Sequence, residues 1–276
     1  MKPRPLITLT SDFGAGSFVG LMKGVIWGVC PRANIVDLCH VVAAQDVWGG
    51  AVVMAEALAS FEPGAVHVAV VDPGVGTERR GLCLRAGGQL FVGPDNGLFT
   101  AALQTPGGWR AWRLDNRRFF RHSVSDTFHG RDIFAPVAAW LARGVAPEEL
   151  GPAVDDPICL DWPRPQRRGQ ALIGQIIDAD RFGNLTSNLG RELVLGFLAG
   201  APASVTLDGP AGPLVIDGLS RAYGQAPPGR AVALFDSLGR LELAQVNGDL
   251  AAALGLGPGR ARGLELRILR GACPAG

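Results

Sequence analysis

The hydrophobic and polar positions in the first half of the chain follow two different periods. Short apolar runs at Leu6–Thr10 and Val66–Val71 have the length of buried strands. Apolar residues recur at helical spacing in three segments, 17–29, 46–60 and 131–142. Pro136 lies inside the last segment and marks a start or bend of that helix. Two further runs, Leu82–Arg85 and Gln89–Val92, predict a hairpin. This order predicts a three-layer-like α/β domain with a mostly parallel sheet.

The pattern changes in the second half of the chain. Four prolines fall within residues 151–168, which predicts an extended linker. Beyond it, glycine and proline turns separate short strand-like runs at 171–177, 204–207, 214–217, 231–235 and 264–269. Helical patterns are sparse there, so we expect a small all-β, barrel-like domain. The predicted domains are residues 1–160 and 161–276.

Composition and charge narrow the class of protein. Hydrophobic residues make up 47% of the chain and charged residues 18%, which is typical of a compact globular protein. The net charge is +1, with 26 basic and 25 acidic residues, so the sequence predicts no nucleic-acid partner. The five cysteines form no Cys-x-x-Cys pair and indicate reduced thiols. No apolar stretch reaches the roughly 18 residues of a membrane span, and the expected location is the cytoplasm.

Two aspartates follow predicted strands of the parallel sheet. Asp12 comes after Leu6–Thr10, and Asp72 comes after Val66–Val71 at the start of a glycine-rich segment, 72–80. Because ligands bind outside the carboxyl ends of such strands, both aspartates are candidates for a binding or catalytic role. Alternatively, each is a turn or cap aspartate. The glycine-rich segment lacks the lysine of a Walker phosphate loop, and a plain tight turn is its simpler interpretation.

His129 precedes the helical pattern that starts near residue 131, where a side chain can face the same crevice. Arg79 lies in the glycine-rich segment, and an arginine at such a position is usually a solvated surface charge. We interpret the other histidines, His40, His67 and His122, as structural or surface residues.

In the second half, Asp178–Asn184 follows a predicted strand and is either a hairpin turn or a ligand-binding segment. Tyr223, the sole tyrosine, either stacks on a base or packs at a domain edge.

Taken together, these segments resemble the S-adenosylmethionine hydroxide adenosyltransferase family, relatives of the enzymes that make fluoro- and chloro-deoxyadenosine. The matching stretches run in order over nearly the whole chain. They are 9–14, 22–24, 45–46, 72–80, 91–97, 128–134, 180–184 and 237–240.

The resemblance implies an α/β domain, a β-barrel-like domain and a homotrimer with active sites between subunits. It also implies an enzyme in which water attacks the ribose 5′ carbon of S-adenosylmethionine, giving adenosine and methionine without metal or cofactor. The implied catalytic residues are Asp72, Arg79 and His129. The implied substrate-binding residues are Asp12 at the ribose hydroxyls, Asp180 and Ser237 at the methionine end, and Asn184 and Tyr223 at adenine.

Two positions depart from the halogenating relatives. Ser17 stands where those relatives have an acidic residue, and Leu238 stands in place of an arginine. These departures affect the expected contacts to the methionine amino group and to adenine.

The sequence is also compatible with three other functions. A halide-using relative would transfer chloride or fluoride to the same carbon, although Gly130 stands where fluoride-using relatives place a hydroxyl side chain. A non-catalytic module would bind adenosine or S-adenosylmethionine and have no use for a titrating His129. A metal-dependent phosphoesterase would be built on Asp12, Asp72 and His129.

Overall fold

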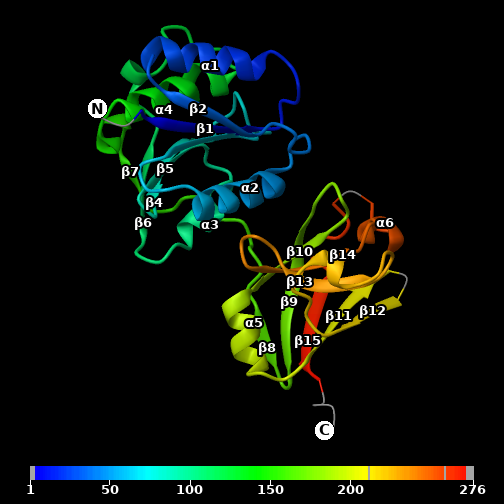
Figure 1. The fold of residues 1–276 in the computed structure, drawn as a ribbon. Helices are drawn as coiled ribbons and strands as arrows, with labels where there is room; N and C mark the ends of the chain where they lie inside the picture. Colours follow the sequence, from blue (N-terminus) through cyan, green and yellow to red (C-terminus); the bar gives the residue numbers. More distant parts are fainter. Residues whose placement is uncertain (1–3, 211, 258, 272–276) are drawn as a thin grey trace. The chain divides into compact units, whose positions relative to one another are not determined.

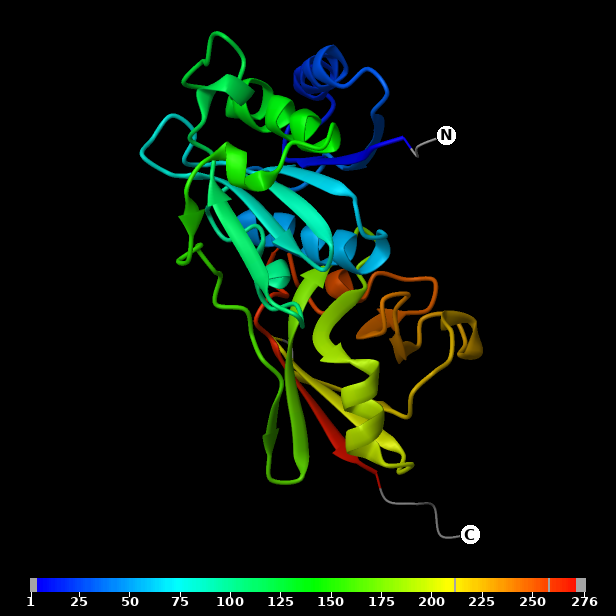
Figure 2. The ribbon, with the colours of Figure 1, turned by 90° about the vertical axis from the view of Figure 1, so that its left-hand side faces the viewer.

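The computed structural model describes residues 4–210, 212–257 and 259–271. The chain divides into two compact units, Met1–Trp162 and Pro163–Gly276, which we call the amino-terminal and carboxy-terminal units. Their elements are drawn in Figure 1 and, from a second direction, in Figure 2.

A seven-stranded sheet with the order β2-β1-β3-β5-β4-β6-β7 forms the centre of the amino-terminal unit. Its strands are β1 (Leu6–Ser11), β2 (Asn34–Cys39), β3 (Val66–Val70), β4 (Gly81–Ala86), β5 (Gln89–Pro94), β6 (Trp109–Arg113) and β7 (Ala153–Val154). Strands β2, β1, β3 and β5 pair in parallel, whereas β4, β6 and β7 extend the sheet by antiparallel pairing. The predictions of a mostly parallel sheet and of the β4–β5 hairpin are confirmed.

Helices cover both faces of this sheet. They are α1 (Phe18–Val29), α2 (Val47–Ser60), α3 (Thr100–Leu103) and α4 (Ala135–Ala142), with 3-10 turns η1 (Arg117–Phe119) and η3 (Pro147–Leu150). Helices α1 and α4 lie over one face and α2 and α3 over the other (Figure 1). Asp46 begins α2, because its carboxylate accepts a hydrogen bond from the Gly49 N–H at 3.0 Å. Buried Met54 and Ala57 then face the sheet.

The helix predicted over residues 131–142 has two parts. A π-helical turn, η2 (Gly130–Phe134), precedes α4, and Pro136 lies in the first turn of α4. Because Pro136 has no N–H, the carbonyl of Asp132 has no helical donor four residues later. It accepts instead from the N–H of Arg121 at 2.9 Å, which ties the preceding loop to the helix start.

The carboxy-terminal unit is built on a curled antiparallel sheet with the order β12-β11-β15-β9-β10-β14-β13, and β8 pairs with β9. Its strands are β8 (Gln166–Arg168), β9 (Ala171–Ala179), β10 (Leu185–Gly190), β11 (Ala203–Gly209), β12 (Gly212–Asp217), β13 (Ala231–Phe235), β14 (Arg240–Gln245) and β15 (Glu265–Arg270). The edge strands β12 and β13 approach one another, so the sheet is a nearly closed barrel. The barrel-like prediction is confirmed.

Two details of the second half differ from the sequence prediction. The unit is not all-β, because it contains helices α5 (Arg191–Leu198) and α6 (Leu250–Ala253) and a 3-10 turn, η4 (Tyr223–Gln225). The segment 151–168 is not wholly extended linker either. It supplies the edge strand β7 to the first sheet and β8 to the second.

The cysteines within the described residues are free thiols: Cys30, Cys39, Cys83 and Cys159. The fifth, Cys273, lies outside the described residues. Burial raises the pKa of the Cys83 thiol to about 12, so this group stays protonated and inert. In the described part of the chain, no helix has both the length and the apolar character needed to cross a bilayer.

Candidate active site

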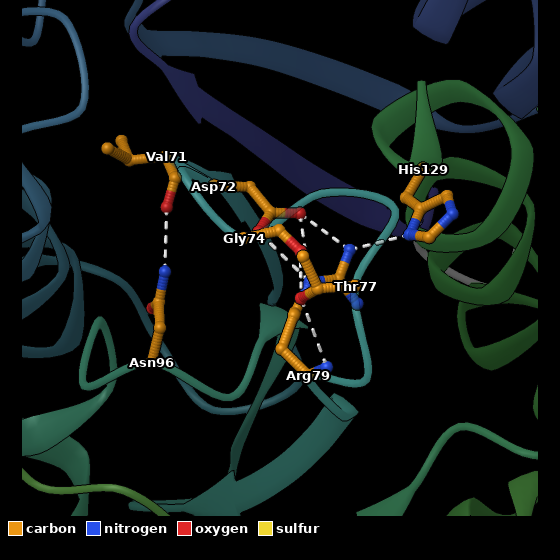
Figure 3. Close-up of polar contacts among 7 residues, drawn as sticks. All are labelled: Val71, Asp72, Gly74, Thr77, Arg79, Asn96 and His129. Atoms are coloured by element: carbon orange, nitrogen blue, oxygen red, sulfur yellow. Dashed lines mark hydrogen bonds and ion pairs between the residues drawn. The ribbon is translucent and has the colours of Figure 1, made fainter. Parts of the chain in front are cut away.

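Asp72 stands immediately beyond β3, at the edge of the parallel sheet where ligands bind. The residue before it, Val71, is fully buried, and its carbonyl accepts a hydrogen bond from the Asn96 side-chain amide at 2.8 Å (Figure 3). This bond links the ends of β3 and β5 and fixes the chain at the point where the Asp72 side chain begins.

The segment after Asp72 folds back so that Arg79 faces it. The Thr77 hydroxyl donates to the Gly74 carbonyl at 2.7 Å, and Arg79 N–H donates to the Thr77 oxygen at 3.4 Å. Gly76 has a φ of +77°, and a Cβ there would lie 2.5 Å from the Asp126 carbonyl oxygen. A glycine is therefore required for this segment to approach the loop that leads to His129.

Asp72 and Arg79 form a well-shielded ion pair. The Arg79 Nη2 lies 2.5 Å from Asp72 Oδ2, and its Nε lies 2.9 Å from Oδ1. The Asp72 side chain is 5% exposed and the Arg79 side chain is 12% exposed. The guanidinium also lies over the Phe134 ring, 5.2 Å from its centroid. Removing one partner of such a pair leaves a charge poorly solvated, which typically costs about 3–5 kcal/mol.

His129 completes a contiguous set of three side chains (Figure 3). The same Nη2 of Arg79 lies 2.6 Å from Nδ1 of His129. Since a guanidinium only donates, Nδ1 must accept, and the proton of the neutral imidazole lies on Nε2. Burial and the charge of Arg79 lower the pKa of His129 below its usual value, against the opposing effect of nearby carboxylates. The imidazole is therefore neutral at pH 7.

Asp132 anchors the loop before His129, a role the sequence analysis did not identify. Its buried carboxylate accepts from Arg131 Nε at 2.7 Å, Arg121 Nη1 at 2.7 Å and Ser125 N–H at 3.0 Å. Burial alone would raise the pKa of Asp132, but these hydrogen bonds outweigh it and lower the pKa to about 2. The carboxylate thus stays charged and holds residues 121–132 in one arrangement. The Arg-Asp pair directly after His129-Gly130 was the signal available in the sequence.

Asp12 follows β1 at the same edge of the sheet. Its Oδ2 accepts from the backbone N–H of Gln45 at 2.8 Å. Gln45 adopts a φ of +63°, in the left-handed region that only glycine occupies freely. Asp12 is therefore held by the loop between β2 and α2, and it caps no helix.

The carboxy-terminal unit contains a cavity of about 630 Å³. Its lining residues are Asp180, Phe182, Asn184, Tyr223, Gln245, Asn247 and Gly248. Three of the five predicted substrate-binding residues thus share one cavity. The last three lining residues were not anticipated, and the turn-forming Asn-Gly pair at 247–248 was the only sequence signal for them.

The turn between β9 and β10 shapes one side of this cavity. Asp180 Oδ1 accepts from the N–H groups of Phe182 at 2.8 Å and Asn184 at 2.9 Å, and Oδ2 accepts from the Asn184 side-chain amide at 3.0 Å. The hairpin-turn interpretation of this segment is correct, and the same turn presents its side chains to the cavity. Phe182 is 60% exposed there, which leaves an aromatic face open to a ligand.

Tyr223 lines another side of the cavity and pairs with a buried carboxylate. Its hydroxyl donates to Glu242 Oε1 at 2.6 Å. Burial, with the neighbouring Glu242, raises the pKa of Tyr223, so the phenol stays protonated. Burial also raises the pKa of Glu242, although the bond from Tyr223 opposes this.

Ser237 does not line this cavity. It is exposed in the turn between β13 and β14, where Asp236 Oδ1 accepts from Leu238 N–H at 2.9 Å and Arg240 N–H at 2.8 Å. Ser17 is also exposed and makes no side-chain cap bond at the start of α1. Within residues 4–271, leaving out the undescribed 211 and 258, no three His, Cys, Asp or Glu side chains are grouped to hold a metal ion.

Comparison with known proteins identifies relatives over almost the full length. The family model for the SAM hydroxide adenosyltransferase N-terminal domain matches residues 7–151, and the model for its C-terminal domain matches 174–262. A Salinispora tropica protein named (R)-S-adenosyl-L-methionine hydrolase is 40% identical over 94% of this chain and 97% of its own. A Thermus thermophilus protein of the same name is 39% identical over 96% of this chain and 100% of its own.

Further relatives are less similar in sequence. A fluorinase from Nocardia brasiliensis is 29% identical over 90% of this chain and 92% of its own. The crystal structure of a conserved Thermotoga maritima protein matches with a TM-score of 0.88 and 32% identity, covering 96% of this chain and 100% of that one.

Proposed function

The chain belongs to the SAM hydroxide adenosyltransferase family, and we propose that it hydrolyses S-adenosylmethionine at the ribose 5′ carbon, giving adenosine and methionine. The observation that carries this proposal is the contiguous set of Asp72, Arg79 and His129 at the ligand-binding edge of a parallel sheet, in which the Asp72–Arg79 ion pair is shielded from solvent. The family name describes transfer of the adenosyl group to hydroxide, which is the same substitution.

The bond changes explain why an acid is not needed. The oxygen of water bonds to C5′ while the C5′–S bond breaks. The electron pair of the C5′–S bond stays on sulfur, so methionine leaves as a neutral thioether. Only the water must lose a proton. A fixed set of donors and acceptors around that water lowers the barrier by orientation, and exclusion of bulk solvent favours a transition state in which charge is lost.

The hydrogen-bond pattern assigns different tasks to the three residues. With Nδ1 bound by Arg79, neutral His129 presents Nε2–H, which donates to a water oxygen and orients it. Proton uptake at Nδ1 requires Arg79 to turn away from the imidazole. Asp72 is the other proton acceptor in the set, and the hydrogen bonds from Arg79 hold its carboxylate in one orientation.

The remaining predicted residues are assigned to substrate binding. We propose that Asp12 accepts hydrogen bonds from the ribose hydroxyls, and that Asp180 and Ser237 bind the methionine end. Asn184 and Tyr223 are assigned to adenine, which the aromatic and amide character of the cavity lining supports. The reaction as written uses no metal and no cofactor, and the expected location is the cytoplasm.

Substitutions at the catalytic set test this function. His129→Ala and Asp72→Asn are expected to lower kcat at least 100-fold with smaller changes in KM, measured by chromatographic detection of adenosine. His122→Ala, an exposed histidine outside the set, serves as the matched control. Turnover near that of the unmodified enzyme in both variants would remove these residues from the mechanism.

The fluorinase relatives make halide transfer the second candidate. The same incubation with added chloride or fluoride separates the two functions by product. Adenosine as the only nucleoside product supports hydrolysis, whereas a 5′-halogenated nucleoside supports the alternative.

A further inference from the structure

A chain of side-chain contacts ties the segment that carries Asp12 to the neighbouring strand and helix. Lys23 of α1 lies 2.5 Å from Asp37 of β2. The other oxygen of Asp37 lies 2.9 Å from Nε2 of His40. Nδ1 of His40 lies 2.8 Å from the hydroxyl of Ser11, the residue before Asp12. Neither Lys23, Asp37, His40 nor Ser11 has a role in the reaction described above.

The Asp37 carboxylate, at one end of this series, fixes the direction of the hydrogen bond that His40 makes to it. A carboxylate only accepts, so Nε2 of His40 carries the proton that Asp37 receives. Nδ1 lies 2.8 Å from the Ser11 hydroxyl, and it accepts the hydroxyl proton in the tautomer that carries its one proton on Nε2. The Ser11 oxygen in turn lies 3.4 Å from the Phe13 N–H, which donates to it. Hydrogen bonds from Lys23 and His40 outweigh the effect of burial and lower the pKa of Asp37, so the carboxylate end stays charged.

Two backbone contacts join the same pair of loops. The N–H of Gly14 donates to the carbonyl of His40 at 2.8 Å. The N–H of Gln45 donates to Asp12 Oδ2 at 2.8 Å, from a left-handed conformation that is unfavourable for a non-glycine residue. The loop that begins at His40 therefore holds residues 11–14 through both ends of that segment and through the Asp12 carboxylate itself.

Serine, histidine and aspartate in series also make up the nucleophilic triad of many hydrolases. Here Ser11 is only 1% exposed, and its oxygen is occupied by the Phe13 N–H. A substrate cannot reach this oxygen. The series therefore acts on the position of the residues next to Ser11.

We propose that His40 is a positioning residue that fixes the Asp12 carboxylate toward the ribose hydroxyls of the substrate. This inference rests on the proposed role of Asp12. Without the bond from Ser11 to Nδ1, residues 11–14 gain freedom and the Asp12 carboxylate is no longer held in one orientation.

The test compares the affinities for adenosine and 2′-deoxyadenosine, which differ in one ribose hydroxyl. Calorimetric Kd values are measured for the unmodified protein, His40→Ala, His40→Asn and the control His122→Ala. The unmodified protein is expected to prefer adenosine. His40→Ala should lower this preference about tenfold, while His40→Asn, whose amide oxygen replaces the Nδ1 acceptor, should retain most of it. The control should leave the preference unchanged.

A purely structural role of His40 would lower both affinities and the melting temperature but keep the ratio of the two Kd values. That result would overturn the proposal. Ser11→Ala breaks the same contact with little change in volume, and an unchanged ratio in this variant would also overturn it. If the unmodified protein itself shows no preference for adenosine, the proposed role of Asp12 is wrong, and the failure lies there.

Discussion

His129 shows how one hydrogen bond sets the chemistry of a residue. Because Arg79 donates to Nδ1, the imidazole is neutral, and burial together with this guanidinium lowers the pKa of His129 below its usual value of about 6.5. The position of His129, just before a predicted helix, suggested that its side chain faces the crevice at the edge of the sheet. It contained no information on which nitrogen carries the proton.

The lowered pKa predicts the pH dependence of activity. If the reaction requires the neutral imidazole, kcat/KM falls as the pH drops through the pKa of His129 in the free enzyme. The fall in kcat/KM on the acid side of the pH profile should therefore be centred below about pH 6.5. A pH–rate profile of the unmodified enzyme measures it, and His122→Ala should give the same limb. A limb centred above pH 6.5 would contradict the assignment.

His67 was predicted to be structural, and its surroundings agree. Its Nδ1 lies 2.8 Å from the Thr8 hydroxyl and its Nε2 lies 2.8 Å from the Gln89 side-chain oxygen, with the residue fully buried in β3. Burial lowers the pKa of His67 to about 4, although the bond to Gln89 opposes this. The folded protein therefore holds this ring neutral where the unfolded chain protonates it.

This difference predicts a loss of stability in mild acid. The contribution of His67 is fully present above about pH 6.5 and is lost as the pH falls toward 4, because the unfolded state binds the extra proton. Urea unfolding at pH 7 and pH 5 should show a decrease in the free energy of unfolding that is about 2 kcal/mol smaller in His67→Gln than in the unmodified protein. Equal decreases in the two proteins would show that His67 is not responsible.

At the scale of elements, the segment 72–80 depends on its close approach to the loop before His129. Gly76→Ala places a Cβ against the Asp126 carbonyl and is expected to lower kcat at least tenfold, because Arg79 is displaced from His129. Gly64→Ala is the matched control, since Gly64 also has a positive φ, +98°, but nothing within 4 Å of its Cβ position. Both variants should lose stability. Equal turnover in the two would show that the approach at Asp126 does not matter.

Elements with a clean apolar pattern were predicted from the sequence, and those with mixed patterns were not. Strands β1 and β3 are rich in apolar residues, with buried Thr8 and His67 as polar exceptions, because the sheet buries both of their faces. Strand β2 was missed, since it lies at the sheet edge and carries the polar Asp37 in its middle. Helix α5 was missed because it is only eight residues long and contains Gly196.

The candidate site was predicted in part for a similar reason. Asp72 and His129 were recognised because they follow or precede strongly patterned elements, and the structure brings both to Arg79. The supporting contacts of Asp132 and His40 join segments far apart in the chain, and no local pattern indicates such pairings. Ser237, suggested by family resemblance alone, lies outside the cavity that its predicted neighbours share.

At the scale of the whole molecule, the two compact units have separate hydrophobic cores. Two buried clusters lie on the faces of the amino-terminal sheet, and a third fills the carboxy-terminal barrel. The residues assigned to the reaction belong to the first unit, and those assigned to adenine and methionine belong to the second.

We propose that the functional molecule is a homotrimer with active sites between subunits, as the family resemblance implies. Light scattering coupled to size-exclusion chromatography should give three times the mass of one chain, without dependence on concentration in the micromolar range. A monomeric mass together with full activity would rule out this assembly as a requirement for catalysis.

The proposed hydrolysis requires that water attacks the 5′ carbon of the ribose. Incubation of the enzyme with S-adenosylmethionine in ¹⁸O-labelled water, followed by mass spectrometry of the products, tests it most directly. Attack by water on this carbon gives adenosine that carries the label in its 5′ hydroxyl, together with unlabelled methionine. Adenosine without the label, or no adenosine at all, would contradict it.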